Sequence, residues 1–136
     1  MATFTRFEDI ESWQKSRLLA RNVYRLTTEG VFARDFGLRD QIRRSAVSIM
    51  ANIAEGFGRG GNKEFVALLS IARGSCAEVK SHRYVALDTG MIVQADFDEL
   101  FLLAGEVEGL VSGLMKYLAN SEARGRKFVP ARDREP

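Results

Sequence analysis

Hydrophobic residues recur along the chain every three or four positions, which is the period of an amphipathic α-helix rather than the alternation of a strand. The clearest such stretch runs from Leu38 to Gly58. Its apolar positions are Leu38, Ile42, Ala46, Ile49, Ile53 and Phe57. Residues 9–28, 63–89 and 96–120 show the same spacing. The pattern therefore predicts four helices and no strand.

Polar residues and glycines at the ends of these stretches indicate where the helices begin and end. Asp9 and Asn62 are candidate N-caps of the first and third helices. Asp96, followed three residues later by Glu99, resembles a capping box for the fourth. Gly90 is a natural stop for the third helix, and the segment 56–62 is read as a glycine-rich turn after the second.

Several side chains are expected in the core besides the second helix's apolar row. We expect Phe4 and Phe7 to fold back onto the bundle, and Phe32 and Phe36, in the connection 29–37, to plug its end. The expected buried face of the first helix is Ile10, Trp13, Ala20, Val23, Tyr24 and Thr27. That of the third helix is Phe65, Leu68, Leu69, Ala72, Cys76, Val79, Arg83 and Ala86.

Four helices joined by short links predict an all-α fold, an antiparallel up-down-up-down four-helix bundle. We assign it to a single domain over residues 1–120 and expect the polar residues 121–136 to be a disordered basic tail. The fourth helix is apolar on more than one face. Either its core face is wide, or the second apolar face is covered by another subunit.

Cysteine usage and hydropathy indicate the cellular compartment of the protein. Cys76 is the only cysteine, so no disulfide can form within the chain, as is usual in a reducing compartment. The N-terminal residues lack the apolar core of a signal peptide, and no run of about 18 apolar residues occurs. We expect a cytoplasmic protein with no membrane partner.

Patterns that suggest enzyme chemistry are weak. Gly56, Gly58 and Gly61 match G-x-G-x-x-G, but a dinucleotide site needs a strand before that motif, and here a helix precedes it. A di-iron bundle needs Glu-x-x-His pairs; His82 is the only histidine, and Val79 stands where the acid would be. We expect a non-enzymatic protein with no catalytic residue, metal, cofactor or small-molecule substrate.

Polar residues on the second and third helices form one candidate constellation. Packing the two helices antiparallel can bring Arg44 to Glu78, and Glu55 to Arg73 or the turn. This predicted network consists of Arg44, Asn52, Glu55, Arg73 and Glu78. Our main interpretation is structural, because paired polar groups restrict how helices slide. A ligand pocket is the alternative.

Basic residues are concentrated in the first half of the chain. Residues 13–63 carry ten bases and only four acids, whereas residues 96–108 carry five acids and no base. Arginine-rich surfaces attract phosphate backbones without reading sequence. A solvated helix face is the alternative. The candidate nucleic-acid-binding residues are Arg39, Arg43, Arg59 and Lys63, followed by Arg21 and Arg25.

Several of these residues match a known pattern. The motif consists of Gln41-Ile42-Arg43-Arg44-Ser45-Ala46, Ser48-Ile49 and Asn52-Ile53-Ala54-Glu55-Gly56. The flanking matches are Phe7, Ile10, Trp13 and Tyr24, then Glu64-Phe65, Ala72-Arg73-Gly74-Ser75 and Glu78. Over about residues 7–118 the sequence resembles the four-helix bundle proteins encoded in 23S rRNA intervening sequences. The accessory protein of diversity-generating retroelements is similar to this group.

The resemblance implies a bacterial, non-enzymatic bundle that assembles as a homopentamer and has a suspected nucleic-acid role through its basic surface. It supplies no catalytic residues. Two hypotheses follow: a homo-oligomer that binds RNA or DNA without sequence preference, or a protein-binding scaffold that uses the apolar surface of the fourth helix.

Overall fold

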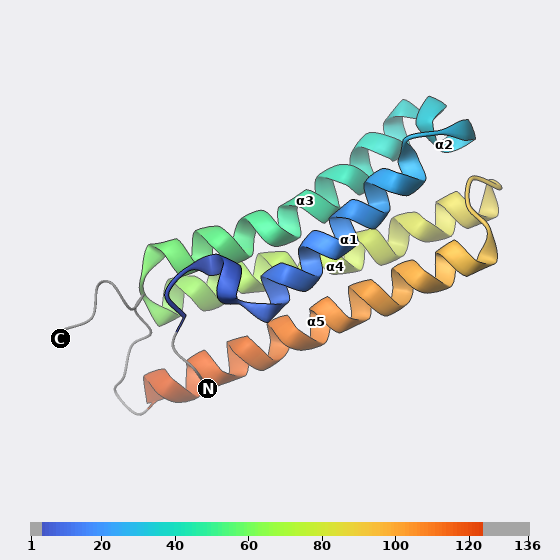
Figure 1. The fold of residues 1–136 in the computed structure, drawn as a ribbon. Helices are drawn as coiled ribbons and strands as arrows, with labels where there is room; N and C mark the ends of the chain where they lie inside the picture. The colour runs from blue at the N-terminus through green and yellow to red at the C-terminus, as the bar shows by residue number, and fades with distance from the viewer. Residues whose placement is uncertain (1–3, 124–136) are drawn as a thin grey trace.

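Every element of the computed structural model is a helix within residues 4–123, the range that the structure describes (Figure 1). The elements are a 3₁₀ turn η1 (Phe7–Asp9) and the helices α1 (Glu11–Thr27), α2 (Gly30–Arg34), α3 (Phe36–Arg59), α4 (Asn62–Asp88) and α5 (Gln94–Ala123). The four long helices α1, α3, α4 and α5 lie alongside one another as a bundle. The prediction of an all-α fold is confirmed.

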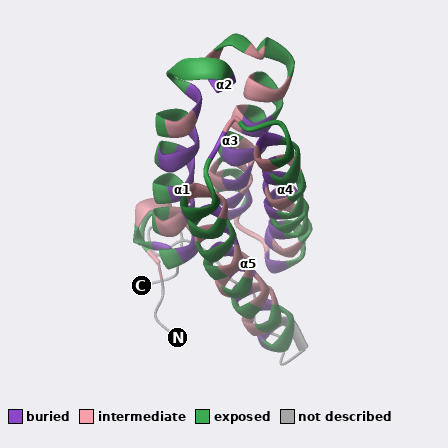
Figure 2. Ribbon diagram, turned by 90° about the vertical axis from the view of Figure 1, so that its right-hand side faces the viewer, coloured by how far each residue is buried: buried purple, intermediate pink, exposed green. Residues whose placement is uncertain are grey.

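Each long helix packs against two others. Helix α3 contacts α1 and α4, and α5 contacts the same two helices from the other side. Buried positions face inward on all four helices, and exposed positions cover the outside (Figure 2). The arrangement places the two polar surfaces discussed below along the seams where α3 meets α1 and α4, and an aromatic surface where α4 meets α5.

The apolar row of the second predicted helix forms the inward face of α3. Ile42, Ala46, Ile49 and Ile53 are at most 1% exposed, as expected. The helix begins before Leu38, at Phe36, because the Asp35 carboxylate accepts a hydrogen bond from the Leu38 amide and so caps it. Gly60, with a φ of +86°, ends the helix in the left-handed conformation that glycine tolerates.

The start of α1 corrects two expectations. Asp9 does not cap this helix: it ends η1, and its carboxylate accepts from the Thr5 hydroxyl and the Thr5 and Arg6 amides. Tyr24 is 42% exposed rather than buried, and Leu19 is fully buried instead. Four of the predicted core residues, Ile10, Ala20, Val23 and Thr27, are buried, and Trp13 is half-buried.

The aromatic residues outside the long helices behave differently from one another. Phe4 and Phe7 pack against the core, as expected, with the Phe7 ring 5.1 Å from that of Trp13. Phe32 is buried in α2, a short helix inside the predicted connection. Phe36 is 64% exposed, so the expectation that it plugs the bundle end is wrong. Its position at the first turn of α3 leaves the ring outside.

The ends of α4 and α5 also differ from the prediction. Asn62 is not a cap; it is the first residue of α4, and its buried amide donates to the Leu118 carbonyl of α5. Asp96 lies within α5, which starts two residues earlier at Gln94. Gly90 follows α4 with a φ of +74°, as its predicted role as a stop requires.

Helix α5 extends beyond the predicted domain boundary. Residues 121–123 are helical and Ser121 is buried, so the expected disorder does not begin at residue 121. The rest of the predicted tail, residues 124–136, lies outside the described residues. Between residues 4 and 123, no helix is both long and apolar enough to cross a membrane.

Candidate nucleic-acid interface

An open groove of about 340 Å³ runs along the seam between α1 and α3. It is lined by Tyr24, Asp40, Arg43, Arg44 and Val47. We call this surface the α1–α3 groove. It combines two guanidinium groups with one exposed aromatic ring, which is the side-chain chemistry that nucleic-acid backbones and bases contact.

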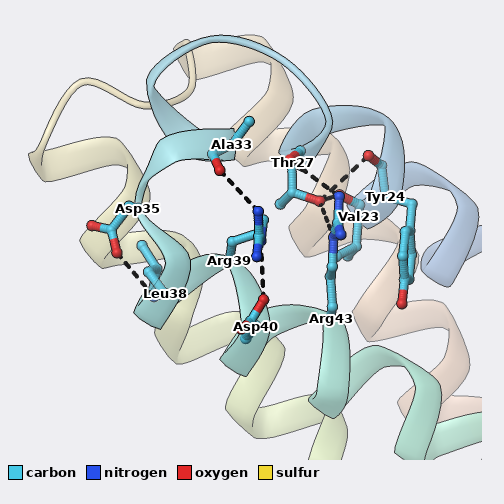
Figure 3. A network of polar contacts seen from close by, with 9 residues as sticks. All are labelled: Val23, Tyr24, Thr27, Ala33, Asp35, Leu38, Arg39, Asp40 and Arg43. Atoms are coloured by element: carbon cyan, nitrogen blue, oxygen red, sulfur yellow. Dashed lines mark hydrogen bonds and ion pairs between the residues drawn. The ribbon is translucent and has the colours of Figure 1, made fainter.

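Arg43 is held in the α1–α3 groove by the end of α1. Its Nε donates to the Thr27 hydroxyl at 2.7 Å, and its Nη2 donates to the Thr27 carbonyl at 3.1 Å (Figure 3). Its Cζ lies 4.4 Å from the centre of the Tyr24 ring. A cation at this position suits the carbonyl-rich end of a helix. These contacts fix the guanidinium and the ring as one unit.

Arg39 lies one turn earlier on α3 and is largely occupied within the chain. Its Nη1 donates to the Ala33 carbonyl, and its Nε contacts the Asp40 carboxylate, each at 3.0 Å (Figure 3). Its Cζ is 4.7 Å from the centre of the Phe36 ring. The Asp40 carboxylate offsets its charge, which makes Arg39 a weaker candidate for phosphate contact than the sequence indicates.

The two candidate bases of α1, Arg21 and Arg25, differ in how far contacts within the chain occupy them. Arg25 hydrogen-bonds Asn22 and lies 3.6 Å from both Asp96 and Glu99 of α5. Arg21, one turn back, is exposed and forms no ion pair or hydrogen bond within the described chain. Arg21 therefore keeps its full charge for an external anion, and Arg25 does not.

Arg59 and Lys63 lie at the other end of the bundle from Arg39. Arg39 and Arg59 are separated by twenty residues of one helix, or about 30 Å at 1.5 Å per residue. Arg59 also pairs with Glu55 one turn earlier. The six predicted bases thus do not form a single surface. Residues of the same charge can lie on different faces and at opposite ends of the bundle, and the sequence alone does not show which.

Arg44 is the base that our candidate set for nucleic-acid contact missed. We expected it to pair with Glu78, but no ion pair joins them in residues 4–123. Arg44 is exposed and lines both the α1–α3 groove and a second cavity between α3 and α4. The sequence signal that could have identified Arg44 as a candidate is its place next to Arg43.

The predicted polar network is only partly assembled. The Ser45 hydroxyl donates to Glu78 at 3.2 Å, and the Asn52 amide donates to the Ser48 hydroxyl at 3.0 Å. The Ser75 hydroxyl joins Ser48 at 3.0 Å. Within the described residues, hydrogen bonds of serine hydroxyls and no ion pair therefore connect α3 with α4. The predicted network contains no serine.

The other charged members of that network form different contacts. Glu55 pairs with Arg59, a residue of the segment 56–62 that we read as a turn and that is helical up to Arg59, so the alternative pairing of Glu55 with this segment is formed. Arg73 donates to the Ser112 hydroxyl of α5 at 3.3 Å. The predicted Glu55–Arg73 link is therefore not formed in the described residues.

The acids at the start of α5 are largely used inside the bundle. Glu106 pairs with Lys15 of α1, and Glu108 pairs with Lys80 of α4. Together with the contacts of Arg25, these pairs neutralise bases on the α5 side. The exposed bases without an ion pair in the described residues are Arg17 and Arg21 of α1, Arg34 of α2, Arg44 of α3, Lys63 and Arg73 of α4, and Lys116 of α5.

A different surface lies where α4 and α5 meet near Gly90. A groove of about 390 Å³ is lined by Arg83, Tyr84, Phe97, Asp98, Phe101 and Leu102, and we call it the aromatic groove. Arg83 is 4% exposed, as its place in the predicted core row requires, and its Cζ lies 3.7 Å from the centre of the Phe97 ring. Tyr84, Phe101 and Leu102 are 54%, 48% and 69% exposed.

Nucleophilic or metal chemistry finds little support in the described residues. Burial raises the pKa of the Cys76 thiol to about 12; Glu108 adds to this shift, and Lys80 opposes it. The thiolate is therefore scarce at neutral pH. Within residues 4–123, no group of three His, Cys, Asp or Glu side chains is placed to hold a metal ion.

Comparison with known proteins places the chain in a family. The family model of the 23S rRNA-intervening sequence protein matches residues 8–113. The chain belongs to this family. No curated protein matches it significantly.

This member of the 23S rRNA-intervening sequence protein family also resembles a solved structure. That structure is a protein of unknown function from the S23 ribosomal protein family of Bacteroides thetaiotaomicron. The two share 24% identity with a TM-score of 0.71, over 77% of this chain and 95% of that one. At this identity the likeness establishes the fold and carries no functional residue across.

Proposed function

We propose that this protein is a non-enzymatic, homo-oligomeric bundle that binds RNA or DNA without sequence preference through the α1–α3 groove. The observation that carries the proposal is that Arg44, which has no ion pair in the described residues, lines the same groove as the fixed Arg43–Tyr24 unit. Arg21, which is exposed and also has no ion pair there, lies one turn before Tyr24 and Arg25 on α1. Unpaired arginines release counterions from phosphates, and an exposed ring offers a stacking surface. Among the predicted bases, the proposal now rests on Arg21 and Arg43 and adds Arg44.

A salt titration tests nucleic-acid binding. Fluorescence anisotropy with a labelled single-stranded RNA, and DNA of the same sequence, should give an affinity that falls linearly with the logarithm of salt concentration. The slope should be about −0.7 per phosphate contact. Binding that is absent, or that does not change with salt, would contradict the proposal.

Charge-removing variants locate the surface. Arg21→Ala and Arg44→Ala should each weaken binding and reduce the salt slope by about 0.7. Lys116→Ala removes an exposed base from α5 and is the matched control, for which we expect no change. Equal losses in all three variants would indicate a diffuse charge effect rather than this groove.

We infer also that the four long helices alternate in direction within a single domain, which extends beyond the predicted boundary at residue 120 to the end of α5. Contacts between opposite ends of neighbouring helices support this topology: Asn62 with Leu118, Ser45 with Glu78, and Arg25 with Asp96. A deletion that leaves residues 1–123 intact should retain the cooperative thermal unfolding of the full chain.

Assembly is the second part of the proposal, and the exposed apolar side chains of the aromatic groove favour it. Apolar patches of this kind mark interaction surfaces. A homopentamer is the state that the family resemblance implies. Light scattering should give a mass five times that of the subunit, and a monomer would contradict this part. A protein scaffold with no nucleic-acid role remains the alternative if the assembly forms and the titration is negative.

A further inference from the structure

A second polar cavity lies on the other side of α3, between α3 and α4. Its volume is about 250 Å³, and its lining residues are all polar: Gln41, Arg44, Ser45, Ser48, Glu78 and His82. Pockets for drug-sized ligands occupy roughly 300–1,000 Å³. This cavity is suited to a smaller group, of the size of one nucleobase, that hydrogen-bonds along its edge.

The charged groups of the cavity restrict what can enter it. Glu78 is exposed, accepts one hydrogen bond from Ser45 at 3.2 Å and has no ion-pair partner within residues 4–123. A carboxylate only accepts hydrogen bonds, so a ligand must bring N–H or O–H donors to it. A simple anion would be repelled by Glu78. Arg44, also without a partner in the described residues, needs an acceptor on the same ligand.

We propose that this cavity takes an unpaired guanine base of the strand bound in the α1–α3 groove; the inference rests on the proposed function. Guanine presents two adjacent donors, N1–H and N2–H, which match the two oxygens of the Glu78 carboxylate. Its O6 and N7 are acceptors for an arginine such as Arg44. Adenine, cytosine and uracil each lack the pair of neighbouring donors.

The groove and the cavity share one lining residue, Arg44. A strand whose phosphates contact Arg43 in the groove would therefore lie close to the cavity. The half-buried His82 ring supplies a flat surface of the kind on which an unstacked base packs, while the N–H groups of Arg44 would meet the O6 and N7 edge of that base. The phosphate contacts would give affinity, and Glu78 would add a preference for one base.

The test compares oligouridine strands that differ at one central nucleotide. Anisotropy titrations with guanosine, adenosine, cytidine or inosine at that position measure the base preference directly. We expect guanosine to bind roughly 5- to 100-fold more tightly than adenosine or cytidine, the range of one bidentate contact. Inosine, which lacks the N2 amine, should fall between them.

Two matched variants assign the preference to the cavity. Glu78→Gln should reduce the guanosine-to-adenosine affinity ratio to about one. Asp88→Asn removes an equal charge from the exposed end of the same helix and should leave the ratio unchanged. Removing either negative charge is expected to raise the affinity for every strand, and this general gain cancels in the guanosine-to-adenosine affinity ratio. Thermal unfolding by circular dichroism verifies that both variants fold as the wild type does.

The outcomes separate this inference from the proposed function. Equal affinity for all four strands, with normal salt dependence, overturns the guanine site and leaves the proposed function standing. Failure of every strand to bind overturns both. Competition by free guanosine monophosphate, and not by adenosine monophosphate, supports the site. Binding of the free nucleotide without a preference among the strands would contradict the claim that the guanine belongs to the strand.

Discussion

Buried polar side chains illustrate how single residues satisfy the interior of this bundle. Asn62 donates to a carbonyl of α5, and Thr27 donates to the Val23 carbonyl of its own helix. Arg83 instead stacks on aromatic rings, with one guanidinium nitrogen donating to the Phe97 carbonyl at 3.3 Å. Burying a polar group is costly unless such contacts replace water. This replacement is incomplete, because among the described residues the buried atoms Ser12 Oγ, Asn22 Nδ2 and Arg83 Nε have no hydrogen-bond partner.

Cys76 gives a residue-scale prediction about pH. Its buried thiol has a pKa of about 12, raised from 9.0 mainly by burial. Because only the unfolded chain loses this proton above pH 9, the contribution of Cys76 to stability is complete below pH 9 and is lost as the pH rises toward 12. Urea unfolding of wild type and Cys76→Ala should show a difference in free energy that shrinks across this interval. A constant difference would contradict the shifted thiol.

Gly56 gives a second prediction at this scale. A methyl group at this position would lie 2.7 Å from Cδ1 of Phe65 and 3.2 Å from Cβ of Leu68. Phe65 is fully buried in the core, so moving its ring would disturb the packing around it. Gly56→Ala should therefore lower the free energy of unfolding by about 1–3 kcal/mol in a urea titration.

Gly58 is the matched control for that substitution. It lies on the same helix, two residues on, and nothing stands within 4 Å of an added methyl group. Gly58→Ala should leave stability unchanged or raise it by up to about 1 kcal/mol, because alanine favours the helix. A loss equal to that of Gly56→Ala would show that flexibility, and not close packing, is what both glycines provide.

Among the elements, α3 contributes both to the core and to the two polar candidate surfaces. Its inward row fills the interior, while Arg43 and Arg44 on its other faces line the cavities on its two sides. The Asp35 cap sets where this helix begins. The position of Arg39 and Arg43 relative to α1 therefore depends on the first turn of α3.

The cap yields an element-scale prediction. Asp35→Ala removes the acceptor of the Leu38 amide and should destabilise the protein by about 1 kcal/mol in chemical unfolding. Asp35→Asn keeps a side-chain oxygen and is the control, for which we expect a much smaller loss. Similar losses for both would indicate that the charge of Asp35, rather than the hydrogen bond, supports the helix.

Periodicity predicted the elements well because burial follows the helical repeat directly. Ile42, Ile49 and Ile53 could be placed in the core from their spacing alone. Helix starts were harder to predict, because Asp9 and Asn62 have competing partners that spacing does not reveal. Those of Asp9 are Thr5 and Arg6, just before η1, and that of Asn62 is the Leu118 carbonyl on α5.

Site residues were the least predictable part of the molecule. The sequence shows that Arg25, Arg39 and Arg43 are basic, but not that Arg25 faces the acids of α5 or that Thr27 binds Arg43. Partner choice depends on which faces of two helices meet, and that is decided by the packing of the whole bundle. For the same reason the isolation of Arg44 from Glu78 could not be read from their spacing.

Considered as a whole, the molecule separates two kinds of surface. Pairs such as Lys15 with Glu106 and Lys80 with Glu108 neutralise charges on α5, whereas Arg43 and Arg44, which form no ion pair in the described residues, line the α1–α3 groove. Exposed apolar side chains gather instead where α4 meets α5. This separation allows one surface to contact other copies while another contacts a nucleic acid. If both proposals hold, an assembly would present several basic grooves to one strand.

That arrangement leads to a prediction about avidity. Leu102→Asp places a charge in the aromatic groove and should shift the mass in light scattering from the assembly to the single subunit. Because linked sites bind a long strand together, affinity for an RNA that spans several grooves should fall by about 100-fold or more, while affinity for a short RNA changes little. Leu18→Asp places the same charge on exposed α1 and is the control. A monomeric variant that keeps full affinity for the long RNA would show that each groove binds alone.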